Sequence, residues 1–183
     1  MNNQHKYKNF ISEIPTDAVE IYRMLPEGTR CEVIFNELIM SPSPSREHQL
    51  LFIKLSSLLF QFLESTQQGT LLSAPFDVYF EPKQSVVQPD LFVVFKEHEH
   101  IIQKNGVHGV PGVIIEIIST KRSHDTKRKR ALYEKAGVNE YFLIDPENKM
   151  VTLLTLNTSG IYEQTYELAG IFESALLSCK LTF

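Results

Sequence analysis

The run Val113-Ile-Ile-Glu-Ile-Ile118 constrains the fold most strongly, because it places one carboxylate, Glu116, inside an otherwise apolar segment. Its short length and its β-branched side chains predict a strand that is buried on both faces. An ionised carboxylate in an apolar interior costs several kcal/mol unless it is paired, hydrogen-bonded or bound to a metal. The rest of the chain must therefore bring a partner to Glu116.

The composition is that of a globular domain with its own core. The 183 residues are 43% hydrophobic and 22% charged, which suffices without a disulfide or a structural metal. Cys31 and Cys179 are far apart and form no CxxC pair, which excludes a disulfide framework and a thiolate zinc site. We expect a single domain, residues 1–183, with a core over about 43–146, an N-terminal helix and strand over 16–40 and a C-terminal β-hairpin extension over 149–183.

Nothing in the sequence indicates a membrane protein. The N-terminal segment is polar, and no run of about 18 apolar residues occurs. The cysteine usage suits a reducing compartment. We therefore expect a soluble, cytoplasmic protein without membrane contact, and the sequence leaves open whether it forms a homodimer.

Hydrophobic periodicity predicts an α/β (α+β) chain with one central mixed β-sheet flanked by helices. Helices are predicted over 16–25, over about 46–65 with Gly69 closing the helix, and over 125–136 with Gly137 as its stop. Strands are predicted over 30–40 as a strand or bent hairpin, and over 70–73, 75–81, 91–95, 113–118, 140–144, 150–156 and 161–168. Residues 96–112 are predicted to form a surface loop that can include one helical turn, and Glu32 and Glu37 to be exposed strand positions.

Asp90 stands at the start of another buried segment, residues 91–95. If that strand and the strand bearing Glu116 are antiparallel neighbours, the two acids lie beside each other, with Cβ atoms roughly 4.5–5.5 Å apart. Two carboxylates so placed repel, so either one is protonated or a hard divalent cation lies between them. We expect Mg2+ as that cation, with Mn2+ as the alternative.

The last predicted helix offers a further candidate, Lys129. At about 100° per residue, Asp125, Lys129, Leu132, Tyr133 and Ala136 share one face, and Leu132 and Ala136 must face the sheet. Lys129 is then directed inward, toward the end of the strand that carries Glu116. The alternative is a surface ion pair between Lys129 and Asp125, worth a few tenths of a kcal/mol.

Positive charge is concentrated around this helix, although the net charge of the chain is −4. Residues 121–135 hold seven lysines and arginines against two acids, and such a patch can attract a polyanion. On its own the patch is explained more simply as a solvated helix face. The cations outside the inward face include Lys121, Arg122, Lys127, Arg128 and Arg130.

His48 begins the apolar stripe of the long helix, one turn after the helix starts. A lone histidine at such a position is more often a hydrogen-bonded packing residue than a ligand. Both interpretations of His48 are kept.

Several of these residues form an ordered series along the chain, together with their neighbours. Pro89-Asp90 is followed by Glu116-Ile-Ile-Ser119, then by Asp125, Lys129 and Tyr133 at intervals of four, and by Ala136-Gly-Val, Glu140-Tyr141 and Asp145-Pro146. Upstream lie Glu32, Met40-Ser-Pro42 and Pro44-Ser45-x-x-His48. This ordered set resembles the Uma-type restriction endonuclease family of the PD-(D/E)XK nuclease superfamily, over about residues 32–146.

The resemblance implies a nuclease core of helix, three-stranded meander, helix and strand. It implies Asp90 and Glu116 as metal ligands, together with the main-chain carbonyl of Ile117. In the superfamily a lysine usually follows two residues after the strand acid, and here that position is Ile118. Lys129 would have to take the place of that lysine.

The leading hypothesis is therefore metal-dependent hydrolysis of phosphodiester bonds in DNA, with Lys129 stabilising the transition state. The other cations of the patch would bind phosphates without reading bases. His48, Asp125 and Tyr133 are candidates for supporting roles, with core packing as the simpler role for Tyr133. Two other classes remain open: a catalytically inactive nucleic-acid-binding or scaffold protein, which Ile118 favours, and a hydrolase of small phosphorylated substrates, which needs only the two acids.

Overall fold

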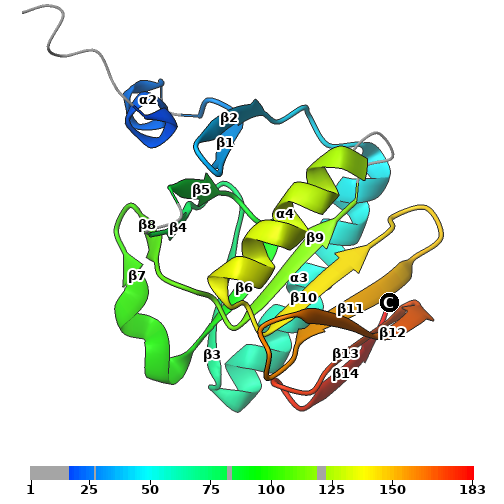
Figure 1. Cartoon of the computed structure of the whole chain (residues 1–183). Helices are drawn as coiled ribbons and strands as arrows, with labels where there is room; N and C mark the ends of the chain where they lie inside the picture. The colour runs from blue at the N-terminus through cyan, green and yellow to red at the C-terminus, as the bar shows by residue number, and fades with distance from the viewer. Residues whose placement is uncertain (1–16, 27, 82–83, 119–122) are drawn as a thin grey trace, which may run out of the picture.

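Helices and sheets alternate in layers, as the mixture of helical and strand-like patterns predicts. The structure is a computed structural model that describes residues 17–26, 28–81, 84–118 and 123–183, the side chains of 123–125 excepted. Within these residues the chain forms two six-stranded sheets and one two-stranded sheet (Figure 1). The predicted α/β (α+β) class is confirmed.

The central sheet has the strand order β12-β11-β10-β9-β6-β3 and contains the most apolar strands of the sequence. Its strands β3, β6 and β9 form an antiparallel meander, and β10 then pairs parallel to β9. The strands are β3 (Gly69–Ser73), β6 (Leu91–Phe95), β9 (Val113–Ile117), β10 (Glu140–Ile144), β11 (Met150–Leu156) and β12 (Tyr162–Ala169). The pairing of β11 with β12 and the antiparallel pairing of β6 with β9 agree with the predictions.

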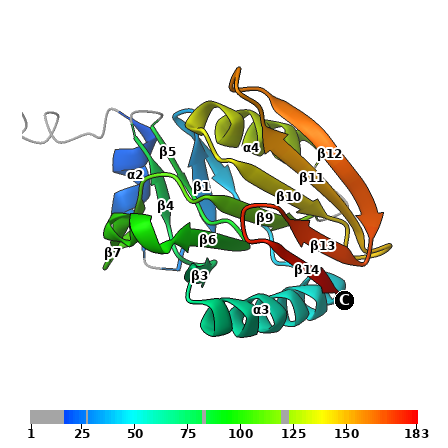
Figure 2. The same ribbon diagram turned by 90° about the horizontal axis from the view of Figure 1, so that it is seen from below.

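Helices α3 (Arg46–Thr66) and α4 (Ser123–Ala136) cover opposite faces of the central sheet (Figure 2). The Ser45 hydroxyl caps α3 by accepting from the His48 N–H at 3.2 Å. The helix ends at Gln67, which has a φ of 54°, and not at Gly69 as predicted. Gly69 instead opens β3, where a Cβ atom would lie 2.4 Å from the Val94 carbonyl oxygen.

The alternation of side chains along the strands divides the core in two. The leucines of α3 pack against Leu91, Val93, Ile115 and other odd-numbered residues of β6 and β9. Leu132 and Tyr133 of α4 pack on the other face, with the even-numbered residues. Residue 116 is even-numbered, so Glu116 belongs to the face that α4 covers, whereas Asp90 lies directly before β6.

A second sheet, with strand order β2-β1-β5-β4-β8-β7, packs on this same face. Its strands are β1 (Cys31–Ile34), β2 (Glu37–Met40), β4 (Val78–Phe80), β5 (Ser85–Val87), β7 (Ile102–Gln103) and β8 (Gly106–His108). The prediction of a single sheet was wrong: the strands predicted over 30–40 and 75–81 contain β1, β2 and β4, but a periodic pattern does not show which sheet a strand joins. The predicted loop over 96–112 was wrong in part, since it holds two strands of the second sheet, whereas the 3-10 helix η1 (Lys96–Ile101) agrees with the predicted helical turn.

The N-terminal hairpin of β1 and β2 brings new side chains to the α4 face. Phe35 and Asn36 close it as a two-residue turn, both with positive φ, which fixes the register Ile34↔Glu37. Arg128 of α4 contacts this hairpin, with Nη1 2.6 Å from Glu37 Oε2. The predicted strand or bent hairpin is thus a hairpin, and it lies beside α4.

Two peripheral elements complete the described chain. Helix α2 (Ala18–Met24) is capped by Asp17, and its Ala18 packs against the second sheet. The hairpin of β13 (Ile171–Ser174) and β14 (Cys179–Thr182) adds Phe172 to the core on the α3 side. None of the described helices has the length and apolar character needed to cross a membrane.

Candidate active site

Asp90 and Glu116 lie at the adjoining ends of two neighbouring strands. The antiparallel register of β6 and β9 pairs Phe92 with Ile114 and Leu91 with Ile115. Asp90 directly precedes β6, and its Oδ2 accepts from the N–H of Ile117, the residue that follows Glu116. The predicted juxtaposition of the two acids therefore follows from the strand register.

Asp90 is held by two groups at the end of its strand. Its Oδ2 accepts from the Ile117 N–H at 2.8 Å and lies 3.1 Å from His48 Nε2. The side chain of Asp90 is 18% exposed and that of His48 10% exposed. The first turn of α3 thus contacts Asp90 through His48. This geometry agrees with the interpretation of His48 as a hydrogen-bonded residue.

Glu116 accepts two hydrogen bonds from α4, the helix that covers its face of the sheet. Its Oε1 lies 2.9 Å from Lys129 Nζ and 2.6 Å from the Tyr133 hydroxyl. Lys129 is only 5% exposed and Tyr133 is fully buried, so the predicted inward face of this helix is confirmed for both. Asp125 belongs to α4, but its side chain lies outside what the structure describes.

Glu32 is the main correction to the sequence analysis. It was predicted to be exposed, yet it is 3% exposed, and its Oε1 lies 2.8 Å from Lys129 Nζ. The same oxygen accepts from the Gln88 N–H at 2.8 Å. The sequence did hold a signal: Glu32 precedes the apolar residues Val33 and Ile34, and a carboxylate beside an apolar strand needs a partner, as Glu116 does.

The electrostatics of this cluster favour exchange of a proton near neutral pH. Burial raises the pKa of Glu116 to about 7; the Lys129 charge opposes this rise, and the charges of Asp90 and Glu32 reinforce it. Burial disfavours the Lys129 ammonium, but Glu116 and Glu32 outweigh that effect and hold the pKa of Lys129 above its usual value. Burial, with the charge of Glu116, raises the pKa of Tyr133 well above its usual value, so it remains a hydrogen-bond donor.

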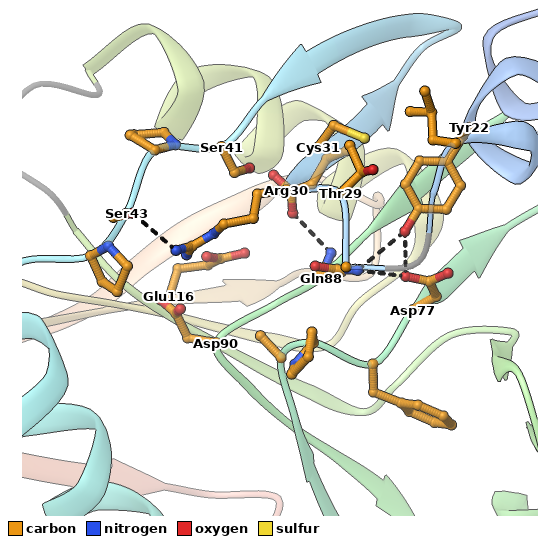
Figure 3. A pocket seen from close by; sticks show the side chains of 18 of the residues that line it. Tyr22, Thr29, Arg30, Cys31, Ser41, Ser43, Asp77, Gln88, Asp90 and Glu116 are labelled. Atoms are coloured by element: carbon orange, nitrogen blue, oxygen red, sulfur yellow. Dashed lines mark hydrogen bonds between the residues drawn. The ribbon is translucent and has the colours of Figure 1, made fainter.

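A pocket of about 890 Å³ opens onto these residues. Figure 3 shows Asp90 and Glu116 toward one side of it and the hydrogen-bonded set of Tyr22, Asp77 and Gln88 toward the other. Its walls come from both sheets and from the first turns of α3. The acids are therefore accessible to a ligand from the side where the second sheet and the central sheet face each other.

Among the described residues of the predicted basic patch, Lys127, Arg128 and Arg130 do not line this pocket. Lys121 and Arg122 lie outside the described residues. Lys127 is exposed, Arg128 pairs with Glu37, and Arg130 donates to the Tyr162 carbonyl at 3.5 Å. Among the described residues, the cations that line the pocket are Arg23, Arg30, Lys104 and Lys129. Arg30 and Lys104 come from loops, where no periodic pattern marked them.

The donor atoms suit a hard divalent cation. Among the described residues, one oxygen of Asp90 and one of Glu116 have no protein partner, and no three His, Cys, Asp or Glu side chains are grouped as a metal site. Mg2+ commonly binds through one or two carboxylates and keeps several waters for exchange with substrate phosphates. The remaining oxygens of Asp90 and Glu116 are ligands of that kind.

Comparisons with known proteins identify the family and the fold of the chain. The model of the Uma2 family, described as "Putative restriction endonuclease", matches residues 18–178. The crystal structure of a putative nuclease belonging to DUF820 from Anabaena variabilis superimposes with a TM-score of 0.73 at 18% identity, and the match covers 92% of this chain and 95% of that one. A search of curated proteins finds no match.

Proposed function

The chain belongs to the Uma2 restriction endonuclease family, and on that premise we propose that it is a metal-dependent endonuclease that hydrolyses phosphodiester bonds in DNA. The observation that carries the proposal is the pair of Asp90 and Glu116 with Lys129 Nζ 2.9 Å from Glu116 Oε1, all lining one pocket. Two acids and a lysine at one site are the groups that this hydrolysis requires.

Asp90 and Glu116, with the Ile117 carbonyl, would hold one or two Mg2+ or Mn2+ ions. A cation bound there would polarise a phosphate oxygen and lower the pKa of an attacking water. His48 and the Ile117 N–H fix the Asp90 carboxylate in position, and the Tyr133 hydroxyl does the same for Glu116. These bonds preorganise both acids before a substrate binds.

Lys129 would supply the positive charge that Ile118 cannot. Its ammonium lines the pocket from α4 and is held beside Glu116, where it can neutralise charge that develops on a phosphate. Lys129 thus compensates from the helix for the lysine that the superfamily usually places on the strand.

Substrate phosphates beyond the site would be bound by exposed cations. Arg30 and Lys104 stand on the wall of the pocket, and Arg30 Nη1 lies 3.3 Å from the Ser43 hydroxyl. The patch around α4, namely Lys121, Arg122, Lys127, Arg128 and Arg130, would extend this surface. Such contacts fix the register of DNA without reading its bases.

A cleavage assay on plasmid and oligonucleotide DNA tests the proposal, with Mg2+ or Mn2+ and with chelator as the control. We expect cleavage that requires the metal and that Asp90→Asn abolishes, with divalent-ion binding weakened and the fold intact by circular dichroism. Glu64→Gln, at an exposed position of α3, is the matched control and should cleave like the wild type. Unchanged metal binding in Asp90→Asn would contradict the ligand assignment.

A second candidate is a nuclease-fold protein that binds nucleic acid, or acts as a scaffold, without cleaving it. Ile118, at the usual lysine position, favours it. Salt-dependent DNA binding without cleavage under any divalent ion would select this candidate over the first.

A further inference from the structure

Glu32 is a buried acid that the hydrolysis proposed above does not use. It comes from β1 of the N-terminal hairpin, which belongs to the second sheet and not to the sheet that carries Asp90 and Glu116. Its side chain is 4% exposed, and its Oε2 is buried without a hydrogen-bond partner among the described residues. Such a group is costly in an apolar setting, so it calls for an explanation beyond packing.

The contacts of Glu32 converge on Lys129. The Gln88 N–H, 2.8 Å from Glu32 Oε1, fixes that oxygen relative to the backbone just before Asp90. The same oxygen lies 2.8 Å from Lys129 Nζ, while Glu116 Oε1 lies 2.9 Å from that nitrogen. The ammonium is therefore held between two carboxylates from different sheets.

We propose that Glu32 is a positioning residue, which holds the Lys129 ammonium at the catalytic pocket and makes the N-terminal hairpin a functional part of the site. The inference rests on the proposed function for its kinetic consequences, but not for the contact itself. A lysine side chain has several rotatable bonds, and one partner leaves its ammonium free to swing about that contact. A second, backbone-anchored partner removes that freedom.

Metal ligation is a less suitable role for Glu32. Its Oε1 is already shared by a main-chain N–H and an ammonium, and within the described chain the acids do not form a three-residue metal group. Packing alone is also less suitable, because an apolar residue would fill the same volume without burying a carboxylate, and it could not accept from Lys129 or from the Gln88 N–H.

A double-mutant cycle of Glu32→Ala and Lys129→Ala tests the proposal through DNA cleavage by the full chain. If Glu32 acts through Lys129, Glu32→Ala should lower kcat at least tenfold with KM within about twofold, yet cause no further loss in the Lys129→Ala background. Glu32→Gln keeps the acceptor oxygen and should restore kcat to within about threefold of the wild type. Additive losses in the cycle, or a Glu32→Gln variant as impaired as Glu32→Ala, would overturn the proposal.

Acylation of lysines, followed by mass spectrometry of the metal-free protein, gives a readout that does not depend on activity. Lys129 should be protected in the wild type and in Glu32→Gln, and should become labelled in Glu32→Ala, while the exposed Lys127 reacts equally in all three. Equal protection of Lys129 in all variants would refute the positioning role. A wild type that cleaves no DNA but shows the expected labelling would refute the proposed function alone. If Glu32→Ala does not fold, comparison of the wild type with Glu32→Gln still tests whether an acceptor at this position suffices for kcat and protection.

Discussion

The pKa of Glu116 leads to a quantitative prediction about stability. Its folded-state pKa is about 7 against an ordinary value of 4.5, because burial and the neighbouring acids disfavour its charge. Between these two pH values the folded protein binds more protons than the unfolded chain, so stability falls as pH rises through this window. At 1.36 kcal/mol per unit, the loss is at most about 3 kcal/mol.

Glu116→Gln removes this titration while keeping an oxygen that can accept from Lys129 and Tyr133. Relative to the wild type, the metal-free variant should therefore gain up to about 3 kcal/mol in unfolding free energy between about pH 4.5 and pH 8. Urea unfolding followed by far-UV circular dichroism, with chelator present, measures the difference at each pH; the chain has no tryptophan for fluorescence.

Glu64→Gln serves as the control, because Glu64 is exposed on α3 and the substitution should change stability little at any pH. A stability difference between Glu116→Gln and the wild type that stays constant across this pH range would refute the reasoning. So would a difference that shrinks as pH rises, since that would mean that the folded protein favours the charged form of Glu116.

Three further predictions follow from the same cluster. Added Mg2+ should raise the melting temperature of the wild type more at pH 8 than at pH 5, because the cation favours ionised acids. In Asp90→Asn, added Mg2+ should not raise the melting temperature at either pH. Calorimetry measures both melting temperatures. Lys129→Ala should lower turnover in the cleavage assay about a hundredfold or more with metal affinity retained, whereas a wild-type rate would show that another lysine replaces the one missing at Ile118. Arg30→Gln and Lys127→Gln should each weaken DNA binding in a salt-dependent way, with turnover at saturation nearly unchanged. Binding isotherms at several salt concentrations measure this effect. If a variant binds DNA as the wild type does at every salt concentration, the substituted residue does not contact DNA.

The elements of the central sheet could be predicted from the sequence, because each one carries its own local pattern. The strand over 140–144 and the pair over 150–156 and 161–168 are long enough to be recognised by their apolar residues, and Gly137 marks the end of α4. The inward angle of Lys129 follows from helical periodicity once Leu132 is assigned to the core. Asp90 and Glu116 were recognised because a carboxylate beside or within an apolar strand needs a partner.

The tertiary structure alone decided which partners these residues have. The sequence did not show that β1, β2 and β4 belong to a second sheet, and Tyr79 of β4 is buried in a cluster with Ala18 of α2 and with Val33 and Val86 of that sheet. Glu32 is distant in sequence from Gln88 and Lys129, so no local pattern could show that they meet. Sequence periodicity determines which face of an element turns inward, whereas the contact between two such faces depends on the packing of the whole chain.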